Sequence, residues 1–128
     1  MPQDRESGNR ARLWGYKMAK IVADDLGATL INPGFSNEAM WNGCRILLKA
    51  AHRGVPQIGA TKASLDRVSA VIVALQVKDK DYTLHEVSSE WFIQHMSPSQ
   101  SPKASHVMMV NCSKVREEGK ELGPMKEL

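Results

Sequence analysis

One stretch of the chain places an acid and a lysine at spacings that suit two neighbouring strands. Residues 36–49 read SNEAMWNGCRILLK, with Glu38 near the start and Lys49 at the end. Asn42-Gly43 lies between two strand-like runs, and this pair favours a tight hairpin because both turn residues tolerate positive φ. The sequence therefore predicts strands at 36–41 and 44–51 that carry Glu38 and Lys49 to the same part of a sheet.

A carboxylate and an ammonium group placed in this way can serve phosphodiester hydrolysis. A carboxylate-held Mg²⁺ stabilises charge around the reacting phosphate and lowers the pKa of its bound water. A lysine can orient the attacking water or stabilise developing negative charge. The same two residues can instead form an ordinary cross-strand ion pair, which contributes about 0–1 kcal/mol when exposed. The residues alone leave both interpretations open.

The elements around this hairpin form a mixed α/β pattern. Apolar residues at helical spacing predict a helix over residues 9–26, and a short strand follows at 28–31. After the hairpin, the predicted elements are a helix capped by Thr61 and ending near Val68, strands at 69–77 and 82–87, a helix at 90–96, a strand at 106–110 and a helix near 114–122. The predicted fold is therefore a mixed β-sheet flanked by helices, in the order α-β-β-β-α-β-β-α with an appended strand and helix. The connection through residues 44–77 predicts at least one parallel pair.

This order of elements resembles the core of the restriction-endonuclease-like nucleases, the PD-(D/E)XK superfamily. The resemblance covers residues 9–77 and includes the Glu38…Lys49 pair on the second and third strands. It implies that Glu38 is a catalytic acid that binds Mg²⁺ and that Lys49 is the catalytic lysine. We assign residues 1–97 to a core domain of this type and residues 98–128 to a linker plus a C-terminal strand-helix extension.

Two positions depart from the superfamily pattern. Asn37 stands where a proline precedes the first acid, and Leu47 stands two residues before the lysine, where a second acid is expected. Some members of the superfamily take the missing carboxylate from the following helix, where Asp66 is the only acid. Asp25, at the end of the first helix, is the alternative. The resemblance thus implies a metal site formed by Glu38 and Asp66.

The distribution of charge favours nucleic acid as the partner, and the resemblance to the nucleases implies DNA. The first 67 residues contain ten Lys/Arg and six Asp/Glu, a net charge of +4, whereas the remaining residues contain seven and eight, a net charge of −1. A basic half is typical of nucleic-acid binders, although it is also common in other proteins. Phosphate contacts of this kind are largely sequence-independent and salt-sensitive. The predicted phosphate-binding residues are Arg10, Arg12, Lys17, Lys20, Arg45 and Arg53.

Several other classes of protein find no support in the sequence. No apolar run approaches the roughly 20 residues that cross a bilayer, and the polar start lacks the apolar region of a signal peptide. We therefore expect a cytoplasmic protein without membrane contact. Cys44 and Cys112 lack a Cys-x-x-Cys spacing, and neither a phosphate-binding glycine loop nor a Gly-x-Ser-x-Gly elbow is present.

The leading hypothesis is a Mg²⁺-dependent nuclease that acts on DNA, or a protein built on that scaffold. A homodimer is expected, because a two-fold pair presents one site to each DNA strand, and the apolar strand at 106–110 offers a dimer edge. The alternative is a non-catalytic nucleic-acid-binding or protein-interaction module in which Leu47 has abolished metal chemistry. An enzyme acting on a small metabolite is a third option, which no cofactor motif favours.

Overall fold

The computed structural model describes residues 5–98 and 107–125, and these residues form two sheets with helices on both faces of the larger one. The helices are α1 (Arg5–Leu26), α2 (Lys62–Arg67), α3 (Ser89–His95) and α4 (Cys112–Glu118). The strands are β1 (Thr29–Leu30), β2 (Glu38–Trp41), β3 (Cys44–Ala51), β4 (Gln57–Thr61), β5 (Ala70–Lys78), β6 (Asp81–Ser88), β7 (Ser97–Pro98), β8 (Val107–Asn111) and β9 (Lys120–Pro124). The mixed α/β class is confirmed.

The larger sheet has six strands in the order β1-β2-β3-β5-β6-β9. Strands β3 and β5 are parallel and are connected through α2, as the strand-helix-strand pattern predicted. The other neighbours in this sheet pair antiparallel. A smaller antiparallel sheet has the order β4-β8-β7.

The predicted hairpin between β2 and β3 is confirmed. Asn42 and Gly43 form its turn with φ values of 51° and 78°, the left-handed region that the Asn-Gly pair tolerates. Trp41 faces Cys44 across the turn, and the same register places Glu38 directly opposite Leu47. This register decides which residues of β3 share a face with Glu38.

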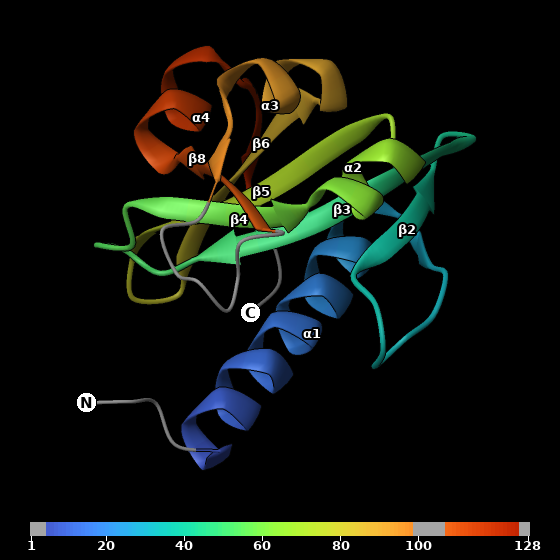
Figure 1. The fold of residues 1–128 in the computed structure, drawn as a ribbon. Helices are drawn as coiled ribbons and strands as arrows, with labels where there is room; N and C mark the ends of the chain where they lie inside the picture. Colours follow the sequence, from blue (N-terminus) through green and yellow to red (C-terminus); the bar gives the residue numbers. More distant parts are fainter. Residues whose placement is uncertain (1–4, 99–106, 126–128) are drawn as a thin grey trace.

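Helices cover both faces of the larger sheet (Figure 1). Helix α1 packs on one face, where Met18 and Val22 meet Ile46, Leu48 and Ile72. The other face is covered by α2, α3, α4 and the smaller sheet, and its core includes Leu47, Val71 and Val73 from the sheet with Leu65, Phe92 and Val115 from the helices. Because neighbouring residues of a strand point to opposite faces, β3 and β5 contribute to both cores. The continuous apolar runs at 46–48 and 70–75 follow from this burial on both sides.

Three strands and the end of α4 differ from the prediction. Strand β4 occupies residues 57–61, to which no strand was assigned, and β7 is a two-residue strand where the expected linker begins. Helix α4 ends at Glu118 and β9 follows at once, so the predicted helix near 114–122 is wrong over its second half. Strand β9 contains Gly123-Pro124 and pairs with the edge of β6, and Leu122 packs against the core. Residues 99–106 lie outside the described residues, and so does His106 of the predicted strand.

The C-terminal residues 107–125 contribute to both sheets and to the core. Strand β8 lies between β4 and β7, so the expected dimer edge at residues 106–110 is wrong for the part that the structure describes. Val110 and Val115 are buried in the same core as Leu47. In the described residues, no helix combines the length and the apolar character needed to cross a membrane.

Candidate functional site

Glu38 is the first residue of β2, and hydrogen bonds hold the chain around it. The Glu38 N–H donates to Ser36 Oγ at 3.2 Å, and the neighbouring Asn37 makes two bonds to Leu48 of β3. Leu48 N donates to Asn37 O at 2.8 Å, and Asn37 Nδ2 donates to Leu48 O at 2.6 Å. These bonds fix the end of the hairpin at which Glu38 lies. The Glu38 side chain is only 5% exposed.

Two arginines enclose the Glu38 carboxylate. Arg45 Nε donates to Oε1 at 2.8 Å. Arg67 donates from Nε to Oε1 at 3.3 Å and from Nη2 to Oε2 at 2.7 Å, which is a two-point contact between guanidinium and carboxylate. We call Glu38, Arg45 and Arg67 the Glu38 cluster. Charge-assisted bonds of this kind are shorter and stronger than neutral ones.

Three elements of the fold bring this cluster together. Glu38 faces Leu47, so Arg45, two residues from Leu47 on β3, points to the same face of the sheet. Arg67 comes from the last turn of α2, which lies over that face. Thr61 caps the start of α2 by accepting from Ser64 N at 3.1 Å, so the helix is anchored at its other end.

The electrostatics of the cluster favour three charged groups. Hydrogen bonding from Arg67 lowers the pKa of Glu38, and the bond from Arg45 and both positive charges act in the same direction, against the effect of burial. In return, Glu38 raises the pKa of Arg67. The cluster therefore carries one negative and two positive charges at neutral pH. The net charge of the cluster is therefore +1, the same as that of one carboxylate with a bound divalent cation.

Lys49 lies on the same face of the sheet as Glu38 but outside the cluster. It is two residues from Leu47 in the direction opposite to Arg45, at a diagonal position whose residues are about 7–8 Å apart. The cross-strand ion pair with Glu38, one of the two interpretations of the sequence, is not among the described contacts, in which both carboxylate oxygens accept from guanidinium groups. Lys49 instead lines a small pocket of about 230 Å³ with Trp14 and His52, whose rings stack at 4.0 Å. Burial lowers the pKa of the Lys49 ammonium group.

The residues around Glu38 do not suit Mg²⁺ in this arrangement. Leu47, at the position of the second acid, is 1% exposed and belongs to the core. Asp66 is an exposed residue of α2, and no hydrogen bond or ion pair links it to Glu38 in the described structure. Asp25 belongs to α1, which packs on the opposite face of the sheet. Two guanidinium charges already contact the carboxylate, and a dication would have to displace them.

No metal-binding group is found elsewhere in the described part of the chain. Among residues 5–98 and 107–125, no three His, Cys, Asp or Glu side chains lie close enough together to share an ion. The Mg²⁺ site of Glu38 and Asp66 thus stays a prediction from the resemblance alone. We derive no catalytic step through it.

The six predicted phosphate-binding residues fall in three separate places. Arg10, Arg12, Lys17 and Lys20 are exposed on α1, and Lys20 forms an ion pair with Asp24 at 3.1 Å. Arg45 belongs to the Glu38 cluster, at the start of β3. Arg53 follows the other end of β3 and lines a larger pocket. Among the described contacts of these residues, Arg45 bonds to Glu38 of the proposed catalytic pair.

The three tryptophans pack against the protein rather than standing free. Trp41 Nε1 donates to Leu26 O at 3.1 Å, and Trp91 Nε1 donates to Glu118 at 3.2 Å. Trp14 stacks on His52 at the edge of the small pocket. Their positions match the role of packing anchors that buried tryptophans usually have.

Sequence comparison adds no family to this geometry. Neither the models of known protein families nor the curated proteins yield a match to this chain. The resemblance to the restriction-endonuclease-like nucleases therefore stays a prediction that depends on the order of elements and on the Glu38…Lys49 pair. The function has to be argued from the side chains themselves.

Proposed function

We propose that this chain is a non-catalytic nucleic-acid-binding module that contacts phosphate groups through Arg45 and Arg67 of the Glu38 cluster. The observation that supports this proposal is the two-arginine contact to a buried carboxylate at the position where a nuclease would hold its metal. The cluster has the net charge of a carboxylate with its dication, so it offers a phosphate a similar attraction. It supplies no metal-bound water, and cleavage is not expected.

The donor groups of the two arginines support phosphate binding. A guanidinium has five N–H donors in a planar fork that matches phosphate oxygens. Arg45 donates to Glu38 through Nε alone. Arg67 donates to Glu38 through Nε and Nη2, and its Nη2 also donates to Ser64 Oγ. In the described residues, both Nη groups of Arg45 and Nη1 of Arg67 have no other hydrogen-bond partner. These side chains are 40% and 48% exposed, so the remaining donors can reach a ligand.

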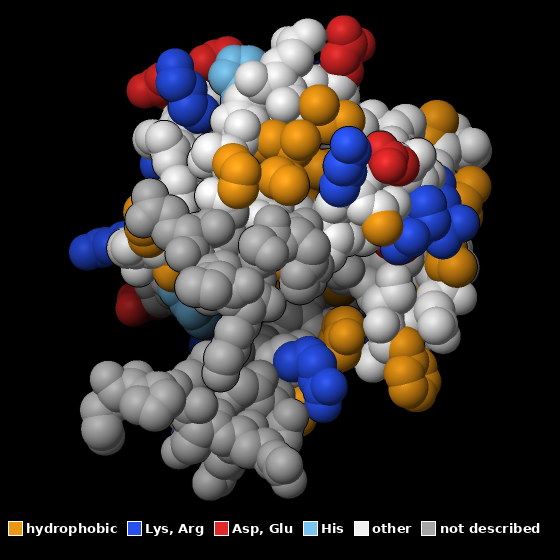
Figure 2. All heavy atoms as spheres, viewed as in Figure 1, with side chains coloured by type: hydrophobic (Ala, Val, Ile, Leu, Met, Phe, Trp, Pro, Cys, Tyr) orange, Lys and Arg blue, Asp and Glu red, His pale blue; other side chains and the backbone are white. Residues whose placement is uncertain are grey.

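The buried carboxylate has a positioning role in this proposal. A free arginine side chain loses considerable rotamer entropy when it binds. Glu38 holds both guanidinium groups before a ligand arrives, which reduces that loss. In Figure 2, Lys and Arg side chains and an acidic side chain lie close together where α2 and the β2–β3 hairpin meet in Figure 1. Lys62 and Asp66 are the further exposed charges of α2.

A nuclease is the second candidate, and Lys49 is the observation that favours it. Its half-buried ammonium group has no ion pair in the described structure and lies on the Glu38 face beside a small pocket. Burial lowers its pKa, as is common for lysines at functional sites. A nuclease would need the Arg–Glu contacts to open so that Glu38 could bind a metal ion. We prefer the binding module because it uses the cluster without rearrangement.

Binding in the absence of metal tests the proposal. Fluorescence anisotropy of labelled single-stranded and duplex DNA and of RNA is measured in EDTA with the wild type, Arg45→Met and Arg67→Met. Lys80→Met is the matched control, because Lys80 is exposed in the turn at the far end of β5. We expect binding that each arginine variant weakens and the control does not. No binding, or equal loss in all three variants, would contradict the proposal.

A cleavage assay separates the two candidates. Plasmid and single-stranded DNA are incubated with Mg²⁺ or Mn²⁺ and with the wild type, Glu38→Ala or Lys49→Ala. The binding module predicts intact DNA in every lane. Cleavage by the wild type that both substitutions abolish would establish the nuclease and overturn the non-catalytic proposal.

The proposed compartment is the cytoplasm, because Cys44 and Cys112 are both free thiols.

A further inference from the structure

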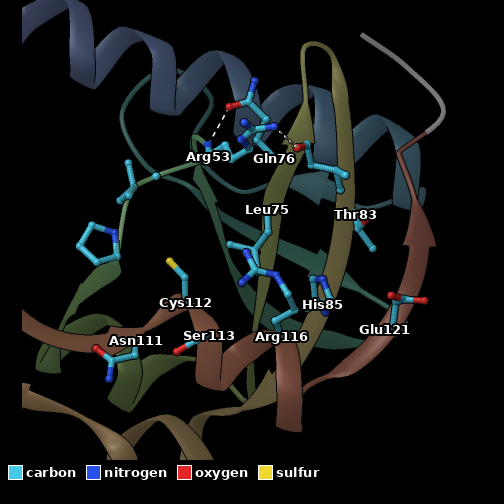
Figure 3. A pocket seen from close by; sticks show the side chains of 14 residues that line it. Arg53, Leu75, Gln76, Thr83, His85, Asn111, Cys112, Ser113, Arg116 and Glu121 are labelled. Carbon is cyan, nitrogen blue, oxygen red and sulfur yellow. Dashed lines mark hydrogen bonds between the residues drawn. The ribbon is translucent and has the colours of Figure 1, made fainter.

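A second, larger pocket lies on the same face of the sheet, away from the Glu38 cluster. Its volume is about 710 Å³, within the range of about 300–1,000 Å³ that is typical of small-molecule sites. Figure 3 shows side chains from β5, β6, β9, the start of α4 and the segment after β3 converging on it. The pocket shares no residue with the Glu38 cluster.

His85 is the unusual residue of this pocket. It lies on β6 opposite Val73 of β5 and Glu121 of β9, and it is only 3% exposed. Its Nδ1 is fully buried without a hydrogen-bond partner, and the described residues provide no hydrogen bond to either ring nitrogen. A buried polar atom without a partner is costly, and such an atom in a native structure calls for an explanation. The ring can also turn without losing a hydrogen bond.

Arg116 provides positive charge next to His85. Arg116 is an exposed residue of α4 that lines the pocket, and its charge acts on both His85 and Cys112 (Figure 3). Within the described residues, Arg116 forms no ion pair. Arg53 also lines the pocket, and Glu121 is the only carboxylate among the lining residues. The lining residues therefore carry two guanidinium groups and one carboxylate, which gives the pocket an excess of one positive charge.

We propose that this pocket binds a small organic anion, whose phosphate monoester or carboxylate group is held by Arg116 and His85. The anion accepts hydrogen bonds from the guanidinium and, after the ring turns so that Nδ1 faces the pocket, from the imidazole, which provides the partner that His85 Nδ1 lacks. The apolar wall formed by Val55, Leu75 and Val77 contacts the body of the ligand. A phosphate and a carboxylate present the same oxyanion chemistry to an arginine fork.

Anion binding should also favour the protonated form of His85. Burial lowers the pKa of this imidazole, while the charges that face it act in opposite directions: Glu121 on β9 raises the pKa and Arg116 on α4 lowers it. Cys112 on α4 is a buried thiol whose pKa is raised, so it adds no charge at neutral pH. A bound anion beside the ring raises the pKa of His85.

The test follows the histidine ring nitrogens of the ¹⁵N-labelled protein by NMR during titration with AMP, adenosine and benzoate. Arg116→Met removes the guanidinium and keeps an unbranched side chain. Lys114→Met is the matched control, because it removes a positive charge from the same helix outside the pocket. We expect AMP or benzoate, but not adenosine, to shift the His85 signals at millimolar concentration. We expect Arg116→Met to weaken this binding about tenfold and Lys114→Met to leave it unchanged.

Each outcome decides the proposal. A response to AMP alone identifies a phosphate ligand, and a response to benzoate alone identifies a carboxylate ligand. Equal binding of adenosine and AMP would show that the anion is not recognised. Unmoved His85 signals with all three probes, or equal effects of the two substitutions, would overturn the site. None of these outcomes bears on the Glu38 cluster, because the two sites share no residue.

Discussion

Leu47 lies directly opposite Glu38 across the β2–β3 ladder, and its side chain is buried in the core beneath α2. The position where the nuclease pattern has its second acid is thus part of the packing. An acid at this position would bury a second carboxylate next to Glu38, and the pair would need a cation. The protein instead has one carboxylate and two guanidinium groups, and this arrangement is the basis of the binding proposal.

Glu38→Gln should destabilise the fold. The substitution keeps the shape of the side chain but removes the charge to which both arginines donate, and it leaves two positive groups close together. Hydrogen bonds to buried charged groups contribute more than neutral ones, and the partial exposure of the arginines reduces the loss. We expect the free energy of unfolding in urea to fall by about 2 kcal/mol. Glu117→Gln, an exposed acid of α4, is the control and should change little. Equal stability of the wild type and Glu38→Gln would mean that the cluster does not stabilise the fold.

The same carboxylate should produce an acid-dependent loss of stability. The pKa of Glu38 in the folded state lies below its ordinary value of 4.5. As the pH falls, the unfolded chain therefore binds the proton first. The contribution of ionised Glu38 to the free energy of unfolding is fully present above pH 4.5 and is lost as the pH falls through the pKa of Glu38 in the folded state. Urea unfolding between about pH 6 and about pH 3 should show a steeper decline for the wild type than for Glu38→Gln. If the free energies of unfolding of the wild type and Glu38→Gln declined in parallel, the lowered pKa of Glu38 would not contribute to stability.

Lys49→Met should stabilise the protein. The substitution replaces an ammonium group that has no ion pair in the described structure by an apolar side chain of similar length. Because burial lowers the pKa of Lys49, charging this lysine at neutral pH opposes folding. We expect the free energy of unfolding in urea to rise by on the order of 1 kcal/mol in Lys49→Met. The control Lys120→Met, at an exposed lysine, should leave it unchanged. A destabilised Lys49→Met would indicate that the lysine has an ion partner or a packing role that the described residues do not provide.

The thiols should differ sharply in reactivity. Cys44 is exposed at the start of β3, whereas Cys112 is buried and its thiol pKa is raised by that burial. Since the thiolate is the reactive form, a disulfide reagent should modify Cys44 rapidly and Cys112 only slowly in the folded protein. Counting the thiols that react before and after unfolding checks this expectation. Cys112 is the one thiol that remains in the Cys44→Ser control. Rapid reaction of this thiol in the folded control would contradict the prediction and show that the pocket around Cys112 opens.

Local signals in the sequence were sufficient for the elements that position the site. The Asn42-Gly43 pair fixed the hairpin and its register, and the apolar run at 69–77 identified the central strand β5. Strands β4 and β9 escaped prediction because each is only five residues long and pairs with a strand that is distant in the sequence, β8 and β6 respectively. The formation of such short strands depends strongly on the partner.

The composition of the Glu38 cluster could be predicted only in part. The hairpin register places Arg45 and Lys49 symmetrically on either side of Leu47, so both were available to Glu38 on the same face. The sequence does not decide between them. Arg67 is 29 residues from Glu38 and reaches it only because α2 crosses over this face. No motif marks that contact, although an arginine in the last turn of the crossover helix was a signal worth testing.

The salt dependence of nucleic-acid binding in EDTA tests the central claim most directly. The logarithm of the binding constant is plotted against the logarithm of the salt concentration for the wild type, the Arg45→Met/Arg67→Met double variant and Lys80→Met. Each phosphate contact contributes about 0.7–0.9 to the slope, so the double variant should lose about 1.5 units while Lys80→Met matches the wild type. A double variant that binds with the affinity and slope of the wild type would contradict the account.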